Sequence, residues 1–149
     1  MVTTAMILAA GLGTRLLPLT KALPKEMLPV VDKPLIQYAV EEAVASGIER
    51  IVLVTARGKG AMEDYFDYAP GLERFLGERG DKAALSEVRR IADMASITYL
   101  RQKEQFGIGH AVLSARQAIV DQPFVLIFPD EIIDHPTPVT QQMIEVHRR

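Results

Sequence analysis

The chain has 149 residues, of which 48% are hydrophobic, enough for one domain with a sizeable core. Its formal net charge of −2 argues against a bulk attraction to nucleic acid or to an anionic membrane. We therefore expect neither a nucleic-acid polymer nor a membrane as partner, and any phosphate binding must be local. The sequence has no cysteine, which excludes disulfides, thiolate zinc sites and a cysteine nucleophile. It shows no bilayer-spanning apolar run and no signal-peptide pattern, so we expect a cytoplasmic protein.

Four short apolar runs predict buried parallel strands, because each run is apolar on both faces. In chain order they are residues 5–10, 51–55, 97–100 and 124–128. Amphipathic helical patterns lie between and after them, at residues 35–46, 85–92, 111–119 and 139–146. Residues 67–81 are the most loop-like interior stretch, with at most a short helix at residues 72–77. The alternation predicts a Rossmann-like, doubly wound α/β fold, with a mostly parallel sheet and helices on both faces.

A glycine turn follows the first predicted strand. Gly11 and Gly13 are compatible either with an ordinary tight turn or with backbone amides that face a ligand. A dinucleotide fingerprint requires a third glycine where this chain has Leu16, and a P-loop requires a Gly-Lys-Ser/Thr ending that is also missing. The second predicted strand ends in Thr55 without the acidic residue that would bind a ribose, so an NAD module is disfavoured.

The turn continues into a loop that carries three cations. Pro18, Pro24 and Pro29 exclude a long helix over residues 9–33 and restrict the conformational freedom of this stretch. Arg15, Lys21 and Lys25 could bind a polyphosphate, because a guanidinium fork and ammonium groups suit phosphate oxygens. A solvated surface loop would have the same composition, so composition alone does not decide between the two.

Two stretches of sequence carry a family resemblance. The segment AAGLGTR at residues 9–15, followed by PKEMLP at residues 24–29, resembles the signature of sugar-1-phosphate nucleotidyltransferases. Within that superfamily, KEMLPVVDKPLIQYAVEEA and the later RQKEQFGIGHAV resemble bacterial UTP–glucose-1-phosphate uridylyltransferases, also called UDP-glucose pyrophosphorylases. The resemblance runs from Met6 to about Asp134. Thymidylyltransferase relatives usually read Lys-Gln-Leu-Leu-Pro where this chain has Lys25-Glu26-Met27-Leu28-Pro29, which favours the uridylyl branch.

The resemblance implies a Mg²⁺-assisted reaction of UTP with glucose 1-phosphate that gives UDP-glucose and pyrophosphate. An oxygen of glucose 1-phosphate attacks the α-phosphorus in line, and no covalent enzyme intermediate is expected. Arg15 matches the arginine at the β,γ-phosphates and Lys25 the lysine at the reacting centre, which makes these two the candidate catalytic residues. Asp130 matches the carboxylate that holds Mg²⁺, a metal that typically takes one or two carboxylates plus phosphates and water.

The resemblance also implies a nucleotide-binding set from three parts of the chain. Its members are Ala9, Ala10, Gly11, Leu12, Gly13, Thr14, Gln102, Gly107 and Gly109. Gln102 can donate and accept hydrogen bonds at once, as a uracil edge requires. Glu26 is expected to be a structural partner and His110 a structural residue, since this chemistry needs no proton transfer. Glu131 is expected to point away from the site if strand geometry persists beyond Asp130.

One departure from the family is length. Family members continue with a sugar-contacting stretch, a second metal-binding aspartate and oligomerisation elements that do not occur before Arg149. We therefore expect residues 1–149 to be the nucleotide-binding N-terminal portion of a nucleotidyltransferase domain, inactive in transfer by itself. An open sheet edge would favour a homo-oligomer. The alternatives are a nucleotidyltransferase for another base or sugar and a non-catalytic, nucleotide-sensing or regulatory paralogue.

Overall fold

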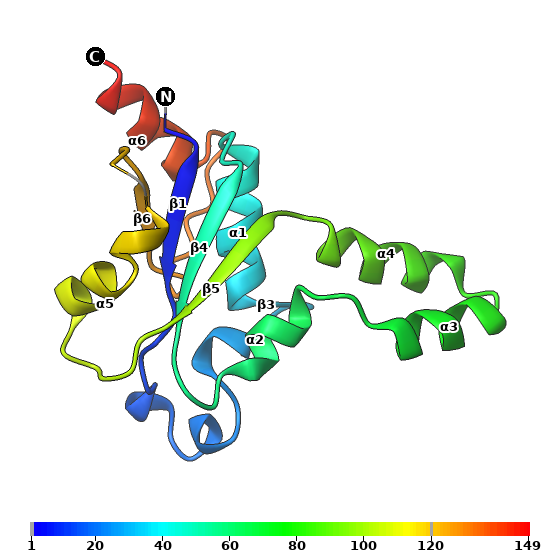
Figure 1. The fold of residues 1–149 in the computed structure, drawn as a ribbon. Helices are drawn as coiled ribbons and strands as arrows, with labels where there is room; N and C mark the ends of the chain where they lie inside the picture. Colours follow the sequence, from blue (N-terminus) through cyan, green and yellow to red (C-terminus); the bar gives the residue numbers. More distant parts are fainter. Residues whose placement is uncertain (1, 120) are drawn as a thin grey trace.

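A four-stranded parallel sheet forms the centre of the protein (Figure 1). The structure is a computed structural model that describes residues 2–119 and 121–149. The strand order is β5-β4-β1-β6, and every neighbouring pair is parallel. The strand bounds are β1 Thr4–Leu8, β4 Arg50–Thr55, β5 Ser96–Arg101 and β6 Val125–Ile127. Each predicted apolar run therefore overlaps a strand, and the predicted mostly parallel α/β sheet is confirmed. The predicted burial holds for most residues of β1, β4 and β6, whereas β5 has no buried residue.

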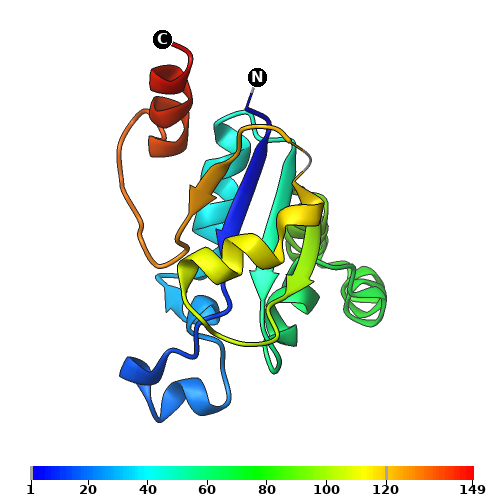
Figure 2. The ribbon, with the colours of Figure 1, turned by 60° about the vertical axis from the view of Figure 1, so that its left-hand side comes forward.

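Helices cover both faces of this sheet (Figure 2). The helix bounds there are α1 Leu35–Ala45, α2 Gly60–Tyr65, α5 Ile108–Ser114 and α6 Val139–His147. α1, α2 and α6 contribute to one core cluster, while α5 contributes to the cluster on the opposite face. The short turn η4 (Arg116–Ala118) follows α5.

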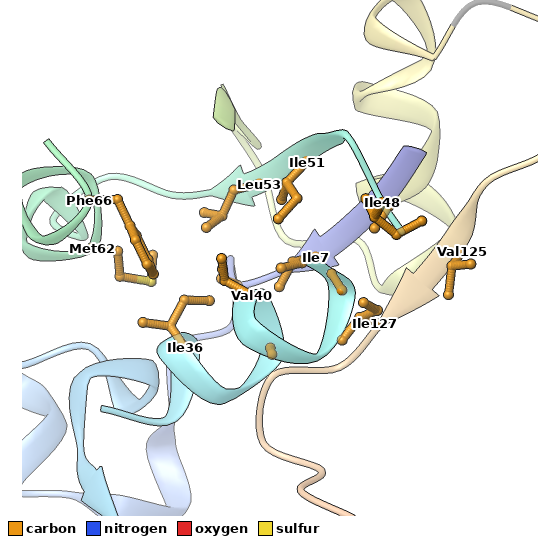
Figure 3. Close-up of a cluster of buried hydrophobic side chains, with 14 of the residues drawn as sticks. Ile7, Ile36, Val40, Ile48, Ile51, Leu53, Met62, Phe66, Val125 and Ile127 are labelled. Atoms are coloured by element: carbon orange, nitrogen blue, oxygen red, sulfur yellow. The ribbon is translucent and has the colours of Figure 1, made fainter. Parts of the chain in front are cut away.

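β1 supplies side chains to both cores because successive residues of a strand point to opposite faces. Ile7 is fully buried in the same cluster as Ile36 and Val40 of α1, and Val40 lies beside it (Figure 3). Met6 is fully buried in the other cluster, together with Ala111 of α5. The central strand is therefore fixed from both sides, and its carboxyl end is held in place for the segment that follows.

The proline-containing segment after β1 forms three short 3-10 turns. They are η1 Thr14–Leu16, η2 Leu19–Lys21 and η3 Lys25–Met27. A small antiparallel hairpin of β2 (Pro29–Val30) and β3 (Lys33–Pro34) then leads into α1. The prediction that no long helix follows β1 is confirmed.

The prediction for residues 67–81 was wrong in part, because the helix there is longer than the expected residues 72–77. This stretch contains α3 (Pro70–Glu78), which packs against α4 (Lys82–Ala92) as a helical hairpin that projects away from the sheet (Figure 1). Pro70 in the first turn and Gly80, with φ +71° just after the end, are typical boundaries of such a helix. α2 was also missed, because only Met62 of its six residues is buried and the apolar pattern is too short to detect. None of the described helices combines the length and the apolar character needed to cross a membrane.

Candidate active site

Two adjoining cavities lie at the carboxyl ends of the strands. The larger has a volume of about 450 Å³ and is bounded by the segments after β1, β5 and β6 and by the start of α5. The smaller, of about 350 Å³, is bounded by the turn η1 with the residues before it. Gly11, Lys25 and Asp130 line both cavities, so the two meet at these residues.

The strand order explains why the cavities form here. From β1 the chain proceeds to β4 and β5 on one side, and it then returns through α5 to β6 on the other side of β1. The connections therefore diverge beside β1, at the topological switch point where open α/β sheets bind their ligands. The segments after β1 and β6 are brought together by the parallel register of these strands.

The two glycines of the turn serve different purposes. Gly13 has φ +66°, and a Cβ there would lie 3.1 Å from Thr20 Cγ2 and 3.2 Å from Lys25 Cβ. The Thr20 hydroxyl also donates a hydrogen bond of 2.8 Å to the Gly13 carbonyl, which fixes the turn. A Cβ on Gly11 would meet only Lys25 Cε, at 4.0 Å. Gly13 is thus required by the backbone, whereas Gly11 leaves space where the cavities meet.

An ion pair joins the loop after β1 to the segment after β6. Lys25 Nζ lies 2.5 Å from Asp130 Oδ2, and both side chains remain partly open to solvent, at 22% and 46%. Partial burial raises the pKa of the Asp130 carboxyl, but the hydrogen bond and positive charge of Lys25 lower it more, so this pKa lies below its ordinary value. Asp130 is therefore ionised at neutral pH and accessible at the edge of both cavities.

A second, buried ion pair joins Glu26 of the loop to Lys59. Both carboxylate oxygens of Glu26, at 2.9 and 2.7 Å, accept hydrogen bonds from Lys59 Nζ. The Glu26 side chain is fully buried and that of Lys59 is 8% exposed. Glu26 is the neighbour of Lys25 in η3, and Lys59 immediately precedes α2. The pair thus fixes the Lys25 backbone to the segment after β4, which agrees with the structural part expected of Glu26.

Gln102 sits at the end of β5 with its side chain directed into the interior. Its backbone N–H donates a hydrogen bond of 2.8 Å to Thr55 O, and the residue is 4% exposed. The side-chain nitrogen Nε2 lies 2.9 Å from Nδ1 of His110, which is part of α5. Gln102 lines the larger cavity, so a buried amide faces this space.

The structure brings most of the predicted site residues together. Predicted residues that line the larger cavity are Ala10, Gly11, Lys25, Gln102, Gly107 and Asp130. Those that line the smaller cavity are Gly11, Gly13, Thr14, Arg15, Lys25 and Asp130. Ala9, Leu12 and Gly109 line neither: Ala9 is fully buried and donates to Val54 O, and Leu12 is 64% exposed.

Several lining residues were missed by the sequence reasoning. In the larger cavity they are Leu8, Gln105, Ile108, Ala111, Phe128 and Glu131, and in the smaller cavity the missed residue is Leu16. For Glu131 the expectation was wrong, because β6 ends at Ile127 and the alternation of a strand no longer applies four residues later. Gln105 and Ile108 flank Gly107, so the Gly-x-Gly motif could have indicated them.

The charges at the site suit an anion together with a divalent cation. Arg15 is exposed and belongs to no ion pair within residues 2–119 and 121–149. The described residues contain no cluster of three or more His, Asp or Glu that could enclose a metal ion. The accessible carboxylate of Asp130, where the two cavities meet, fits Mg²⁺, which is commonly held by one or two carboxylates plus phosphates.

Comparisons with known proteins agree on one family. A family model described as Nucleotidyl transferase matches residues 4–149. The chain is 52% identical to the UTP–glucose-1-phosphate uridylyltransferase of Bacillus subtilis, over 97% of the chain and 50% of that protein. The solved structure of UTP-bound UGPase from Acinetobacter baumannii is similar with a TM-score of 0.94 and 39% identity, over 99% of this chain and 53% of the other.

A further solved structure, a UDP-glucose pyrophosphorylase complexed with UDP-glucose, is similar with a TM-score of 0.82 and 43% identity. That match covers 100% of this chain and 54% of the other. The chain thus spans about half the length of the relatives that it matches.

Alanine substitutions should distinguish Gly13, which the backbone conformation requires, from Gly11, which only leaves space where the cavities meet. Gly13→Ala should lower the free energy of unfolding by about 1–3 kcal/mol, because φ +66° strains an alanine. Gly11→Ala, the matched substitution two residues away, should change it by no more than about 0.5 kcal/mol. Urea denaturation measures both values. Equal destabilisation by the two variants would contradict this assignment.

Breaking the buried ion pair should be costly. Glu26→Gln leaves the Lys59 ammonium buried without a counter-charge, so we expect a loss of about 3–5 kcal/mol in the free energy of unfolding. The matched control Glu87→Gln removes one partner of an exposed pair with Arg90 and should cost less than about 1 kcal/mol.

The double variant Glu26→Gln/Lys59→Met removes the uncompensated charge and should recover much of the loss. Chemical denaturation of all three variants checks this. A Glu26→Gln variant as stable as the Glu87→Gln control would show that the pair does not hold the loop.

Proposed function

Because the chain belongs to the nucleotidyl transferase family, we propose that it binds UTP with Mg²⁺ across the two joined cavities. The reaction that this site would serve is uridylyl transfer to glucose 1-phosphate, which gives UDP-glucose and pyrophosphate. The observation that carries the proposal is the Lys25–Asp130 pair where the cavities meet, since it places a cation for phosphate beside a carboxylate for the metal. The UTP-bound and UDP-glucose-complexed relatives support the choice of nucleotide and sugar.

The proposed nucleotide position follows from the character of each cavity. The larger cavity has a volume within the usual range for small-molecule sites and contains the buried amide of Gln102, which suits a base. The smaller cavity has Arg15 and the backbone of Gly13 and Thr14, which suit the β- and γ-phosphates. The α-phosphate would then lie between them, beside Lys25 and Asp130.

In the proposed mechanism the protein positions the reactants and neutralises charge. An oxygen of glucose 1-phosphate forms a bond to the α-phosphorus while the bond to the bridging oxygen of pyrophosphate breaks. Lys25 would stabilise the negative charge that develops at the α-phosphate, and Arg15 would hold the leaving pyrophosphate with its planar fork. Asp130 would hold Mg²⁺, which when bound supplies further neutralisation of the phosphate charges.

Within this scheme residues 1–149 are the nucleotide-binding portion of a nucleotidyltransferase domain. Residues that orient the sugar are not assigned to any described part of this chain. A nucleoside triphosphate is a metabolite of the cytoplasm, which favours that compartment for the protein.

The proposal predicts how a single lysine contributes to nucleotide binding. Lys25→Ala should weaken binding of UTP in the presence of Mg²⁺ by tenfold or more, since a hydrogen bond to a charged group is worth about 1.5–3 kcal/mol. Lys21→Ala is the matched control, because Lys21 is exposed on the same loop and lines neither cavity. Isothermal titration calorimetry measures both. Equal affinities of the two variants would remove Lys25 from the phosphate site.

We also propose that the chain forms a homo-oligomer through the outer edge of β6. Within the described residues β6 pairs only with β1, and an unpaired strand edge favours association with another chain. Sedimentation velocity should show a concentration-dependent increase in mass. A monomer at every concentration would contradict this proposal.

A further inference from the structure

We propose that His110 is the positioning residue that fixes the side-chain amide of Gln102 for a uracil edge, and that it thereby sets the preference for UTP over CTP. The inference rests on the proposed function, in which Gln102 faces the base. His110 itself needs no contact with the nucleotide. Its contribution is to stabilise one of the two orientations of the Gln102 side-chain amide.

The contact between the two side chains determines which of their atoms donates. Gln102 Nε2 and His110 Nδ1 lie 2.9 Å apart. An amide nitrogen is always a donor, so Nδ1 must be the acceptor and the proton of the neutral ring must be on Nε2. This is the only side-chain hydrogen bond of Gln102 with another described residue, and it uses one of the two amide N–H groups.

Both partners are held where they meet. Gln102 is 4% exposed, and its backbone N–H is bonded to Thr55 O at 2.8 Å, which fixes the start of the side chain. His110 lies in the first turn of α5, and its ring makes an edge contact with Phe106 at 5.2 Å between centroids. The imidazole therefore presents Nδ1 from a fixed position on a helix.

The orientation of the amide matters because its two ends have nearly the same shape and opposite hydrogen-bonding character. With one N–H on His110, the remaining N–H and the oxygen Oε1 are available to a ligand. Uracil offers an N–H donor beside a carbonyl acceptor, which this arrangement complements. Cytosine offers a ring-nitrogen acceptor beside an amine donor. To complement it, the Gln102 amide must rotate by about 180°, so that its nitrogen and oxygen exchange places.

A turned amide would place Oε1 against the lone pair of His110 Nδ1. Two acceptors would then face each other in a partly buried place, unless the ring moved its proton to Nδ1. His110 thus makes the cytosine-compatible orientation less favourable without touching the base. A site with a fixed donor and acceptor rejects a mismatched ligand more strongly than a site whose amide is free to rotate.

The test measures dissociation constants of the 149-residue chain for UTP and for CTP in the presence of Mg²⁺ by calorimetry. We expect the wild-type chain to prefer UTP by about tenfold or more. His110→Phe keeps a ring for the contact with Phe106 but has no acceptor, and we expect its preference to fall several-fold. His110→Asn is the matched rescue variant, because its side-chain oxygen can take the place of Nδ1 and should restore most of the preference. Circular dichroism and thermal unfolding confirm that each variant is folded.

The outcomes distinguish this inference from the proposed function. A wild-type chain that binds neither nucleotide overturns both. A wild-type chain that prefers UTP, with a His110→Phe variant that keeps the same preference, overturns the part assigned to His110 alone. The same conclusion follows if His110→Asn loses as much preference as His110→Phe, because a general effect on packing would then explain both.

Discussion

Parallel pairing of β1 with β4 on one side and β6 on the other is the constraint on which the site depends. It brings together Lys25 and Asp130, which are 105 residues apart in the chain. The Lys25–Asp130 pair is partly exposed, and such surface ion pairs contribute little to the stability of the fold. The position of this pair, where two cavities meet at the switch point of the sheet, is what gives it a proposed function in binding.

The loop that carries Lys25 is held by tertiary interactions in place of a helix. Gly13 allows the left-handed turn, Thr20 bonds to its carbonyl, and Glu26 forms the buried ion pair with Lys59. A loop that is fixed at both ends of its cationic stretch loses less conformational entropy when a polyphosphate binds. The same arrangement leaves Arg15 exposed, so that one cation of the loop is available to a ligand while another is already paired.

The sequence was informative wherever local pattern determines structure. The apolar runs identified β1, β4 and β6 because strands buried on both faces are apolar throughout, and the prolines excluded a helix after β1. The same pattern found β5, although none of its residues is buried. The length of α3 was underestimated because none of its residues is buried, so its apolar positions do not reveal the helical period. The glycine motifs and the family resemblance pointed to most residues that line the cavities.

Contacts between side chains that are far apart in the sequence could not be predicted from local sequence patterns. Nothing near Lys59 indicates that its ammonium is buried against Glu26, 33 residues earlier. His110 was interpreted as a structural residue only, because the sequence does not show that its Nδ1 faces the amide of Gln102. Glu131 was placed away from the site because the end of β6 was expected too late. These features depend on how separate elements meet, which the fold decides.

The central claim is that one nucleotide spans both cavities, and backbone ¹H–¹⁵N spectra of the labelled chain test it most directly. Titration with UTP and Mg²⁺ should shift the amide signals of residues 11–15, of residues 102–107 and of Asp130 together, with one common affinity. The signals of α3 and α4, which project away from the site, should stay unchanged. Shifts confined to one of the two cavities, or centred on α3 and α4, would contradict the account.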